Sequence, residues 1–288
     1  MNGILMKRIS RRNVRGITDE MDMEVIEYKS KRGKVKPNPY NMTSVSDTNK
    51  VIRWGCTSRI NADITYNKPE AIRKASDKLR ARKILEKNDV PIPKTYSLSE
   101  LSNGYELPLI GRPKKHHGGK NFYYCETVID VSKAVADGCE YFQEFYPKTK
   151  EYRVHACHGK VIICSEKFVD DEDTLVWNLT RNKNGEFKAL RWSQIPPHIA
   201  KLGIKAVQAL GLDYGAVDII AEPKVDKPHN AVVLEVNTAP KLGEYGASRY
   251  AEYFDWLLYK NEKREHKEPS YDYWRNFVWS REALKGGE

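Results

Sequence analysis

The chain has 288 residues, 40% of them hydrophobic, which is enough to bury a full core in one large domain or in two to three small, joined ones. No apolar run approaches the ~20 residues needed to cross a bilayer, and the amino-terminal apolar patch is too short for a secretory signal, so we expect a globular, cytoplasmic protein. The five cysteines are odd in number and lack C-x-x-C spacing, which argues against a disulfide framework or a zinc ribbon.

The positive charge is concentrated near the amino terminus. The net charge is +10, and residues 1–60 hold 13 lysines and arginines against 6 aspartates and glutamates, so +7 of it lies in the first fifth of the chain. Such a field favours an acidic partner, whether nucleic acid, a phosphorylated ligand or an acidic polypeptide. A solvated basic face without a dedicated partner is the alternative.

The first elements in chain order are short strands. Residues 23–28 and 50–55 are strand-like pieces between polar loops, so we expect a small basic domain over residues 1–70. Ser76 is suited to cap a helix that starts at Asp77, and two prolines after residue 90 end that helix.

The middle of the chain predicts a strand, a glycine-containing turn and a strand over residues 107–126, and two or three further strands over residues 140–168. In the second stretch, apolar residues stand at alternating positions on either side of a turn: Val154, Ala156, Val161 and Ile163. Residues 196–210 then carry an apolar stripe at helical spacing, and Gly211 is suited to end this helix.

Residues 215–223 and 230–237 are apolar strands around a polar turn, which predicts an antiparallel hairpin. This pairing sets Asp218 opposite Glu235, and the period of two places Asn237 on the same side as Glu235. The three oxygen-bearing side chains suit a magnesium ion, and a solvent-exposed polar hairpin end is the alternative. Without a cation Asp218 would repel Glu235, so we expect removal of Glu235 to leave the metal-free fold as stable or more stable.

Two other clusters are weaker candidates. The "HACH" stretch at residues 155–158 would need a distant cysteine to complete a zinc site. The aromatic residues after position 250 could stack nucleic-acid bases, but aromatic residues at helical spacing are more typical of faces that cover a core.

Taken in order, the motifs from about Ser76 to Leu242 resemble those of the ATP-grasp ligases, which include D-alanine–D-alanine ligase, glutathione synthetase and the ribosomal-protein glutamate ligases. The resemblance is nearest to the ribosomal-protein glutamate ligase and glutathione synthetase branch, because Ala216 stands where D-alanine ligases carry an arginine. It implies an α+β ATP-grasp fold, in which two α+β subdomains clasp ATP, with a small basic N-terminal domain and an aromatic-rich C-terminal helical tail. The expected divisions are the basic domain at 1–70, an ATP-grasp domain at 71–250 with a flap at about 108–145 and a metal-binding part at about 146–250, and a C-terminal extension at 251–288.

The resemblance also implies nucleotide-binding residues. Lys78, in the first turn of its helix, corresponds to a lysine that touches ATP phosphate, and Arg112 replaces the family's second phosphate-binding lysine with a bulkier cation. The "KKHHGGKN" stretch resembles the flap over the triphosphate, and "QEFY" together with a following glutamate resembles the segment that holds adenine and ribose. The residues implied in these segments are Lys114, His117, Gly118, Gly119, Lys120, Gln143, Glu144, Phe145, Tyr146 and Glu151.

The implied catalytic residues follow the same order. Arg153 matches the arginine that points at the transferred phosphate, and Lys167 occupies a similar basic position one strand later. Asn178 and Arg181 resemble, more loosely, a substrate-side loop. The implied cofactors are ATP and two magnesium ions, with manganese as an alternative, held by Asp218, Glu235 and Asn237.

The implied reaction is ATP-dependent ligation of a carboxylate to an amine through an acylphosphate. The sequence identifies neither substrate, and the acceptor is a small molecule or an acidic peptide, protein or nucleic-acid-linked group. No membrane partner is expected, and a homo-oligomer stays open. The alternative from another class is a non-catalytic nucleic-acid-binding protein on a degenerate ATP-grasp scaffold.

Overall fold

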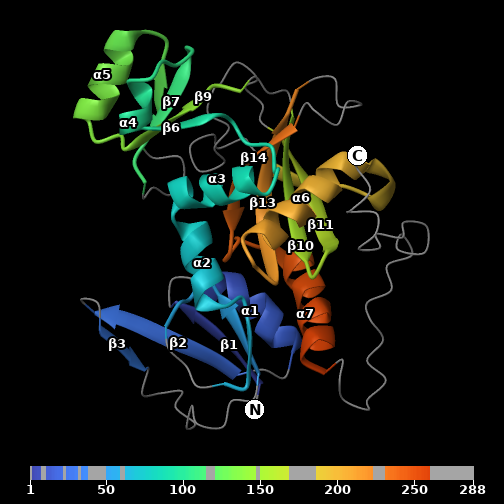
Figure 1. The fold of residues 1–288 in the computed structure, drawn as a ribbon. Helices are drawn as coiled ribbons and strands as arrows, with labels where there is room; N and C mark the ends of the chain where they lie inside the picture. Colours follow the sequence, from blue (N-terminus) through green and yellow to red (C-terminus); the bar gives the residue numbers. More distant parts are fainter. Residues whose placement is uncertain are drawn as a thin grey trace.

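The structure is a computed structural model that describes residues 2–7, 11–21, 24–31, 34–37, 50–58, 62–114, 121–146, 150–168, 186–222 and 231–259. Three sheets follow one another from the bottom to the top of Figure 1, and we call them the N-terminal, central and flap sheets. No helix among the described residues is both long and apolar enough to span a membrane.

The N-terminal sheet has the strand order β3-β2-β1-β4-β5. Its strands are β1 (Asn2–Lys7), β2 (Glu24–Lys31), β3 (Lys34–Pro37), β4 (Lys50–Trp54) and β5 (Ile64–Tyr66). All neighbours pair in parallel except β3, which is antiparallel to β2. The strand-like pieces predicted at 23–28 and 50–55 are therefore confirmed as β2 and β4.

One core joins the N-terminal sheet to the last helix of the described residues. Helix α1 (Arg11–Glu20) contacts helix α7 (Glu244–Tyr259), and α7 lies between the N-terminal and central sheets in Figure 1. Trp54 is fully buried in this core and stacks at 5.9 Å between ring centroids on Tyr214 of the central sheet. Tyr253 and Phe254 of α7 are also buried in it, so the aromatic residues up to 259 cover a core as their spacing predicted. Residues 260–288, the rest of the predicted tail, lie outside the described residues.

The flap sheet has the order β6-β9-β7-β8. Its elements are β6 (Thr95–Ser97), α4 (Leu98–Leu101), β7 (Leu109–Arg112), β8 (Tyr123–Cys125), α5 (Val128–Ala136) and β9 (Tyr141–Glu144). The two strands predicted over 107–126 are confirmed as β7 and β8, and α5 packs against both of them.

The central sheet is antiparallel throughout, in the order β12-β11-β10-β13-β14. Its strands are β10 (Lys150–Cys157), β11 (Lys160–Phe168), β12 (Glu186–Ala189), β13 (Tyr214–Ala221) and β14 (Ala231–Asn237). The short 3-10 helix η3 (Trp192–Gln194) precedes helix α6 (Pro197–Ala209), which covers one face of the sheet. As predicted, α6 ends just before Gly211, whose φ of 71° is in the left-handed region.

The predicted helix start at Asp77 needs a correction. Two helices occupy this region, α2 (Pro69–Ser76) and α3 (Lys78–Lys87). Asp77 is the cap of α3, because its carboxylate accepts the Arg80 N–H at 3.1 Å. Ser76 ends α2 instead, and its hydroxyl donates back to the Ile72 carbonyl at 2.7 Å.

The alternation predicted through Val161 and Ile163 stops at a β-bulge. His155 pairs with Ile163 and Ala156 pairs with Val161, so Ile162 has no partner on β10. The extra residue moves Ile163 to the core that faces α7, whereas Val161 stays in the core under α6. All five cysteines are buried and none forms a disulfide.

Candidate active site

One face of the central sheet is polar where three strands run side by side. Arg153 on β10 is the register partner of Asp218 on β13, and Asp218 is the partner of Glu235 on β14. Asn237 follows two residues after Glu235 and points to the same side, because its amide donates to the Glu235 carboxylate at 2.9 Å. The predicted hairpin and the predicted convergence of Asp218, Glu235 and Asn237 are therefore present in the structure.

Arg153 and Asp218 form a two-pronged ion pair. Arg153 Nε donates to Asp218 Oδ1 at 2.6 Å, and Arg153 Nη2 donates to Asp218 Oδ2 at 2.8 Å. Burial raises the pKa of Asp218, and the charge of Arg153 offsets only part of this rise. Burial would lower the pKa of Arg153, but Asp218 outweighs it and holds that pKa above its ordinary range.

Glu235 is paired with the helix that precedes the flap sheet. Lys78 Nζ in the first turn of α3 lies 2.7 Å from Glu235 Oε2. Burial would raise the pKa of Glu235, but Lys78, the Asn237 amide and Arg153 outweigh burial and hold that pKa well below its usual range. Glu235 is therefore a stabilised carboxylate, which differs from the unpaired, repelled group expected from the sequence.

Asp218, Glu235 and Asn237 suit a hard cation that is bound together with phosphate. Asn237 Nδ2 also lies 3.4 Å from Asp218 Oδ2, so the amide bridges the two carboxylates. Two carboxylates and one amide oxygen are oxygen ligands of the kind that magnesium takes together with phosphate oxygens and water. Among the residues that the structure describes, no three His, Cys, Asp or Glu side chains gather as a metal-binding group, and this includes the "HACH" stretch.

Glu151 and Lys167 form a third pair on this face. Lys167 Nζ lies 2.8 Å from Glu151 Oε1, and both side chains are buried, with 7% and 8% of their surface exposed. Arg153, between this pair and the carboxylates, stacks its guanidinium at 4.5 Å from the ring centroid of Phe187. The three cations implied as phosphate or catalytic groups, Lys78, Arg153 and Lys167, are thus each bound to a carboxylate implied as a metal or ribose ligand.

The segment implied to hold adenine, residues 143–146, begins in the last two residues of β9. Glu144 accepts a hydrogen bond from the Tyr96 hydroxyl at 2.8 Å, and its own N–H donates to the Lys94 carbonyl. The Phe145 N–H donates to the Pro108 carbonyl at 3.0 Å. Gln143 is paired within the sheet, and Tyr146 directly follows Phe145 in the chain. These backbone N–H groups are therefore occupied by the flap sheet itself.

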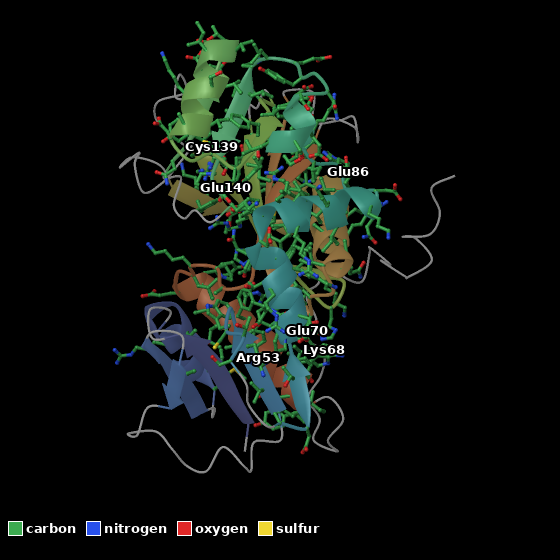
Figure 2. The ribbon with its side chains drawn as sticks, turned by 60° about the vertical axis from the view of Figure 1, so that its left-hand side comes forward. Arg53, Lys68, Glu70, Glu86, Cys139 and Glu140 are labelled. Carbon is green, nitrogen blue, oxygen red and sulfur yellow. The ribbon has the colours of Figure 1, made fainter. Side chains whose placement is uncertain are left out.

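Arg112, at the end of β7, lies with its guanidinium 5.6 Å from the Phe122 ring centroid. Burial lowers the pKa of Arg112, and nearby Tyr141 and Glu235 oppose this effect. Lys114 is directed elsewhere, because its N–H donates to Glu140 at 2.9 Å and its Nζ lies 3.6 Å from the same carboxylate. Glu140 is labelled on the flap sheet in Figure 2.

Sequence reasoning missed Arg82. It lies one turn after Lys78 on α3, is 5% exposed, and carries a positive charge close to Arg112, Tyr141 and Glu235. The available signal was its spacing of four from Lys78, which places both residues on one face of the helix. Several predicted residues lie outside the described residues: His117, Gly118, Gly119, Lys120, Asn178 and Arg181.

No family model matches the chain. The "Probable alpha-L-glutamate ligase 2" of Hahella chejuensis (strain KCTC 2396) is 27% identical over 212 residues, 67% of this chain and 66% of that protein. The chain spans less than two thirds of the length of the curated relatives that it matches.

Solved structures match over nearly the whole chain. A RiPP-associated ATP-grasp ligase of Chryseobacterium gregarium, in complex with ADP and a leader and core peptide, is 16% identical, with a TM-score of 0.61 over 91% of this chain and 97% of that one. The D-alanine–D-alanine ligase of Bacillus anthracis, complexed with ATP, is 14% identical, with a TM-score of 0.61 over 89% of this chain and 94% of that one. The fold is therefore the mixed α/β ATP-grasp fold.

Proposed function

We propose that the protein is an ATP-dependent carboxylate–amine ligase. The observation that supports this most is the set of Asp218, Glu235 and Asn237 at one end of a hairpin, with Lys78 and Arg153 already paired to its carboxylates. Magnesium bound at the carboxylates would neutralise phosphate charge, and the displaced lysine and arginine would then be free to contact the nucleotide.

In the proposed reaction a substrate carboxylate oxygen attacks the γ-phosphorus of ATP. The bond from that phosphorus to the bridging oxygen breaks, ADP leaves, and an acylphosphate remains. An amine then attacks the acyl carbon, inorganic phosphate leaves, and the amine loses a proton as the amide forms. Arg153 and Lys167 hold fixed positive charge where the transferred phosphoryl group carries negative charge, which is the main work left to the protein.

The amine substrate is proposed to be an amino acid. The curated relatives are named alpha-L-glutamate ligases, which supports glutamate as the first candidate. The first 70 residues are proposed to select the acceptor, because the N-terminal sheet reaches the metal-binding end of β14. A Cβ added to Gly55, just after β4, would lie 2.7 Å from Ala239 Cβ, two residues beyond Asn237.

The acceptor is proposed to be an acidic polypeptide. Strand β1 ends opposite Tyr28, so β2 and β3 continue beyond it as a two-stranded ribbon. Lys29 is the register partner of Lys36, and Lys31 is the partner of Lys34. Because residues two apart share a face, these four lysine positions lie on one face of the ribbon. An acidic strand would neutralise them and could also pair with the terminal strand β3, which a nucleic acid cannot.

Nucleotide binding tests the proposal first. ATP with magnesium is expected to raise the melting temperature, as a ligand selective for the folded state must. ADP release is then measured with pools of amino acids, polyamines and acidic peptides. No shift at millimolar ATP and magnesium would contradict the proposed function, and salt-dependent binding of DNA or RNA without ADP release would support the non-catalytic alternative.

The acceptor is tested separately with a polyglutamate peptide. Lys29→Glu combined with Lys36→Glu is expected to weaken binding of this peptide, whereas Lys87→Glu combined with Lys133→Glu, the same charge change at exposed helix positions, is expected to weaken it much less. Equal loss in both variants would show that only net charge matters.

A further inference from the structure

Strand β14 contains a β-bulge directly before Glu235. Ile219 pairs with Val233 and Asp218 pairs with Glu235, so Leu234 is an extra residue without a partner on β13. Bulges of this kind re-aim the side chains that follow them and are frequent next to active sites.

The bulge decides on which face Glu235 lies. Val233 and Ile219 both belong to the core under α6. Regular pairing continued from them would place Leu234 opposite Asp218 and would turn Glu235 into that apolar core. With the extra residue, Glu235 and Asn237 share the polar face with Asp218, and Val236 returns to the core. The carboxylate pair therefore exists only because of the bulge.

Helix α3 and the residues after it hold this bulge. Arg82 Nη2 donates to the Leu234 carbonyl at 3.0 Å, and the Val233 N–H donates to the Pro91 carbonyl at 2.8 Å. Arg82 Nη1 lies 3.4 Å from the Thr95 hydroxyl at the start of the flap sheet. The unpaired residue of the bulge is thus bound by a side chain from the same helix face that presents Lys78 to Glu235.

Burial of Arg82 carries a desolvation penalty, because its guanidinium is removed from water. Only 5% of it is exposed, and none of its hydrogen bonds to described residues reaches a carboxylate. An apolar side chain of similar length would avoid the cost of removing a guanidinium from water. A role in stability alone therefore does not account for a charged donor at this position.

We propose that Arg82 is a positioning residue that fixes the Leu234 bulge and thereby sets Glu235 and Asn237 beside Asp218 for metal binding. This inference rests on the proposed function, because it assigns to the bulge the assembly of the metal ligands. Arg82 acts through β14, whose Leu234 carbonyl it binds.

The test compares ADP binding with magnesium and ADP binding in EDTA, both by calorimetry. The ratio of the two affinities is expected to fall about tenfold or more in Arg82→Met, the scale for losing support behind metal ligands. ADP affinity in EDTA is expected to stay within about twofold, because the apolar substitution removes no proposed nucleotide contact. Arg80→Met, at an exposed position of the same helix, is the matched control and should keep the wild-type ratio.

The outcomes separate the two proposals. A wild-type protein whose ADP affinity does not depend on magnesium would overturn the metal-site proposal and this inference together. A wild-type dependence that Arg82→Met leaves unchanged would overturn the role of Arg82 alone.

Arg82→Lys serves if the methionine variant does not fold. In this variant the ratio of ADP affinities is expected to fall less than in Arg82→Met. Amide hydrogen exchange is expected to become faster at residues 233–237 and to stay unchanged at residues 214–221. An unchanged ratio and unchanged exchange in this variant would also overturn the proposal.

Discussion

The two faces of the central sheet are formed by the same strands and differ in the interactions that cover them. Successive residues alternate between the faces: Val154, Val217 and Val236 lie under α6, and Arg153, Asp218 and Glu235 lie on the other side. The α6 face is closed by side-chain packing within the chain. Part of the opposite face packs under α7, and the rest carries ion pairs, each of which joins a cation to a carboxylate that the proposed reaction would use separately.

This difference separates stability from function. Packing under α6 needs no ligand, so substitutions there should change the free energy of unfolding and leave ligand affinity per folded molecule unchanged. The ion-paired face stores its binding groups in a neutralised form, so substitutions there should change both quantities.

Glu235→Gln is expected to have the largest effect. ADP release is expected to fall about a hundredfold or more, the scale for losing a preorganised electrostatic group. In EDTA the variant should also be less stable by about 1–3 kcal/mol, because Lys78 loses a charged partner. The sign is opposite to the one expected from the sequence, where repulsion from Asp218 dominated.

The pH dependence checks this sign. The pKa of Glu235 is depressed in the folded state, so its contribution to stability is present above the ordinary pKa of 4.5 and is lost as the pH falls below it. Denaturant unfolding in EDTA at pH 7 and pH 4 should therefore show a smaller difference between variant and wild type at the lower pH. A Glu235→Gln variant as stable as wild type at pH 7 would mean that repulsion between Asp218 and Glu235 cancels the contribution of the Lys78 pair.

Substitution of Arg112, which lies in the flap sheet, is expected to have the next largest effect. If its guanidinium binds phosphate, Arg112→Ala should weaken ATP binding roughly tenfold to a hundredfold, the range for a hydrogen bond to a charged group. Arg112→Lys should keep much of the affinity because the charge survives. Calorimetry with ATP and magnesium measures both. Normal affinity in Arg112→Ala would assign the contact to another basic residue of the flap, with Lys114 the first alternative.

The hairpin was predictable because its signal is local. Two apolar runs around a polar turn gave the pairing of Asp218 with Glu235, and the period of two gave the side on which Asn237 lies. The bulges at Ile162 and Leu234 were not predictable, because an extra residue leaves no mark in a run of apolar side chains.

The ion pairs depended on the tertiary fold. Lys78 and Glu235 are 157 positions apart in the chain. The motifs implied ATP phosphate as the partner of Lys78 and magnesium as the partner of Glu235, whereas in the structure the two side chains form an ion pair. Ser76 and Asp77 show the opposite case, because both are favoured N-cap residues: a helix cap was predictable here from local chemistry, but not which of the two residues forms it. Arg82 was missed because a buried arginine and a solvated one look alike in a charged helix.

Gly203→Ala is expected to have a smaller effect, confined to stability. A Cβ at Gly203 on α6 would lie 2.5 Å from Val154 Cγ1 and 2.8 Å from Val154 Cβ, so the helix must shift from the sheet. Overpacking costs about 1–3 kcal/mol, and the better helix propensity of alanine returns up to about 1 kcal/mol. Gly246→Ala on α7 is the control, because its nearest neighbour would be 3.4 Å away, and it should be neutral or stabilising. Loss of ATP affinity in folded Gly203→Ala protein would mean that the two faces are coupled.

The effect that is expected to be smallest at pH 7 concerns His155, which lies two residues after Arg153 and is buried under α7. Its Nδ1 is 3.1 Å from the Tyr250 hydroxyl, and burial, assisted by the charge of Arg153, lowers its pKa from 6.5 to about 3. A histidine held neutral in the folded state contributes stability above pH 6.5 that is lost as the pH falls towards 3, because only the unfolded chain takes up the proton. This contribution has a slope of at most about 1.4 kcal/mol per pH unit.

Urea unfolding of His155→Gln between pH 7.5 and 4.5 should show a shallower loss of stability than wild type, since glutamine can keep the bond to Tyr250 without titrating. Equal slopes in wild type and His155→Gln would mean that His155 accepts a proton in the folded protein and that the face next to Arg153 is open to water.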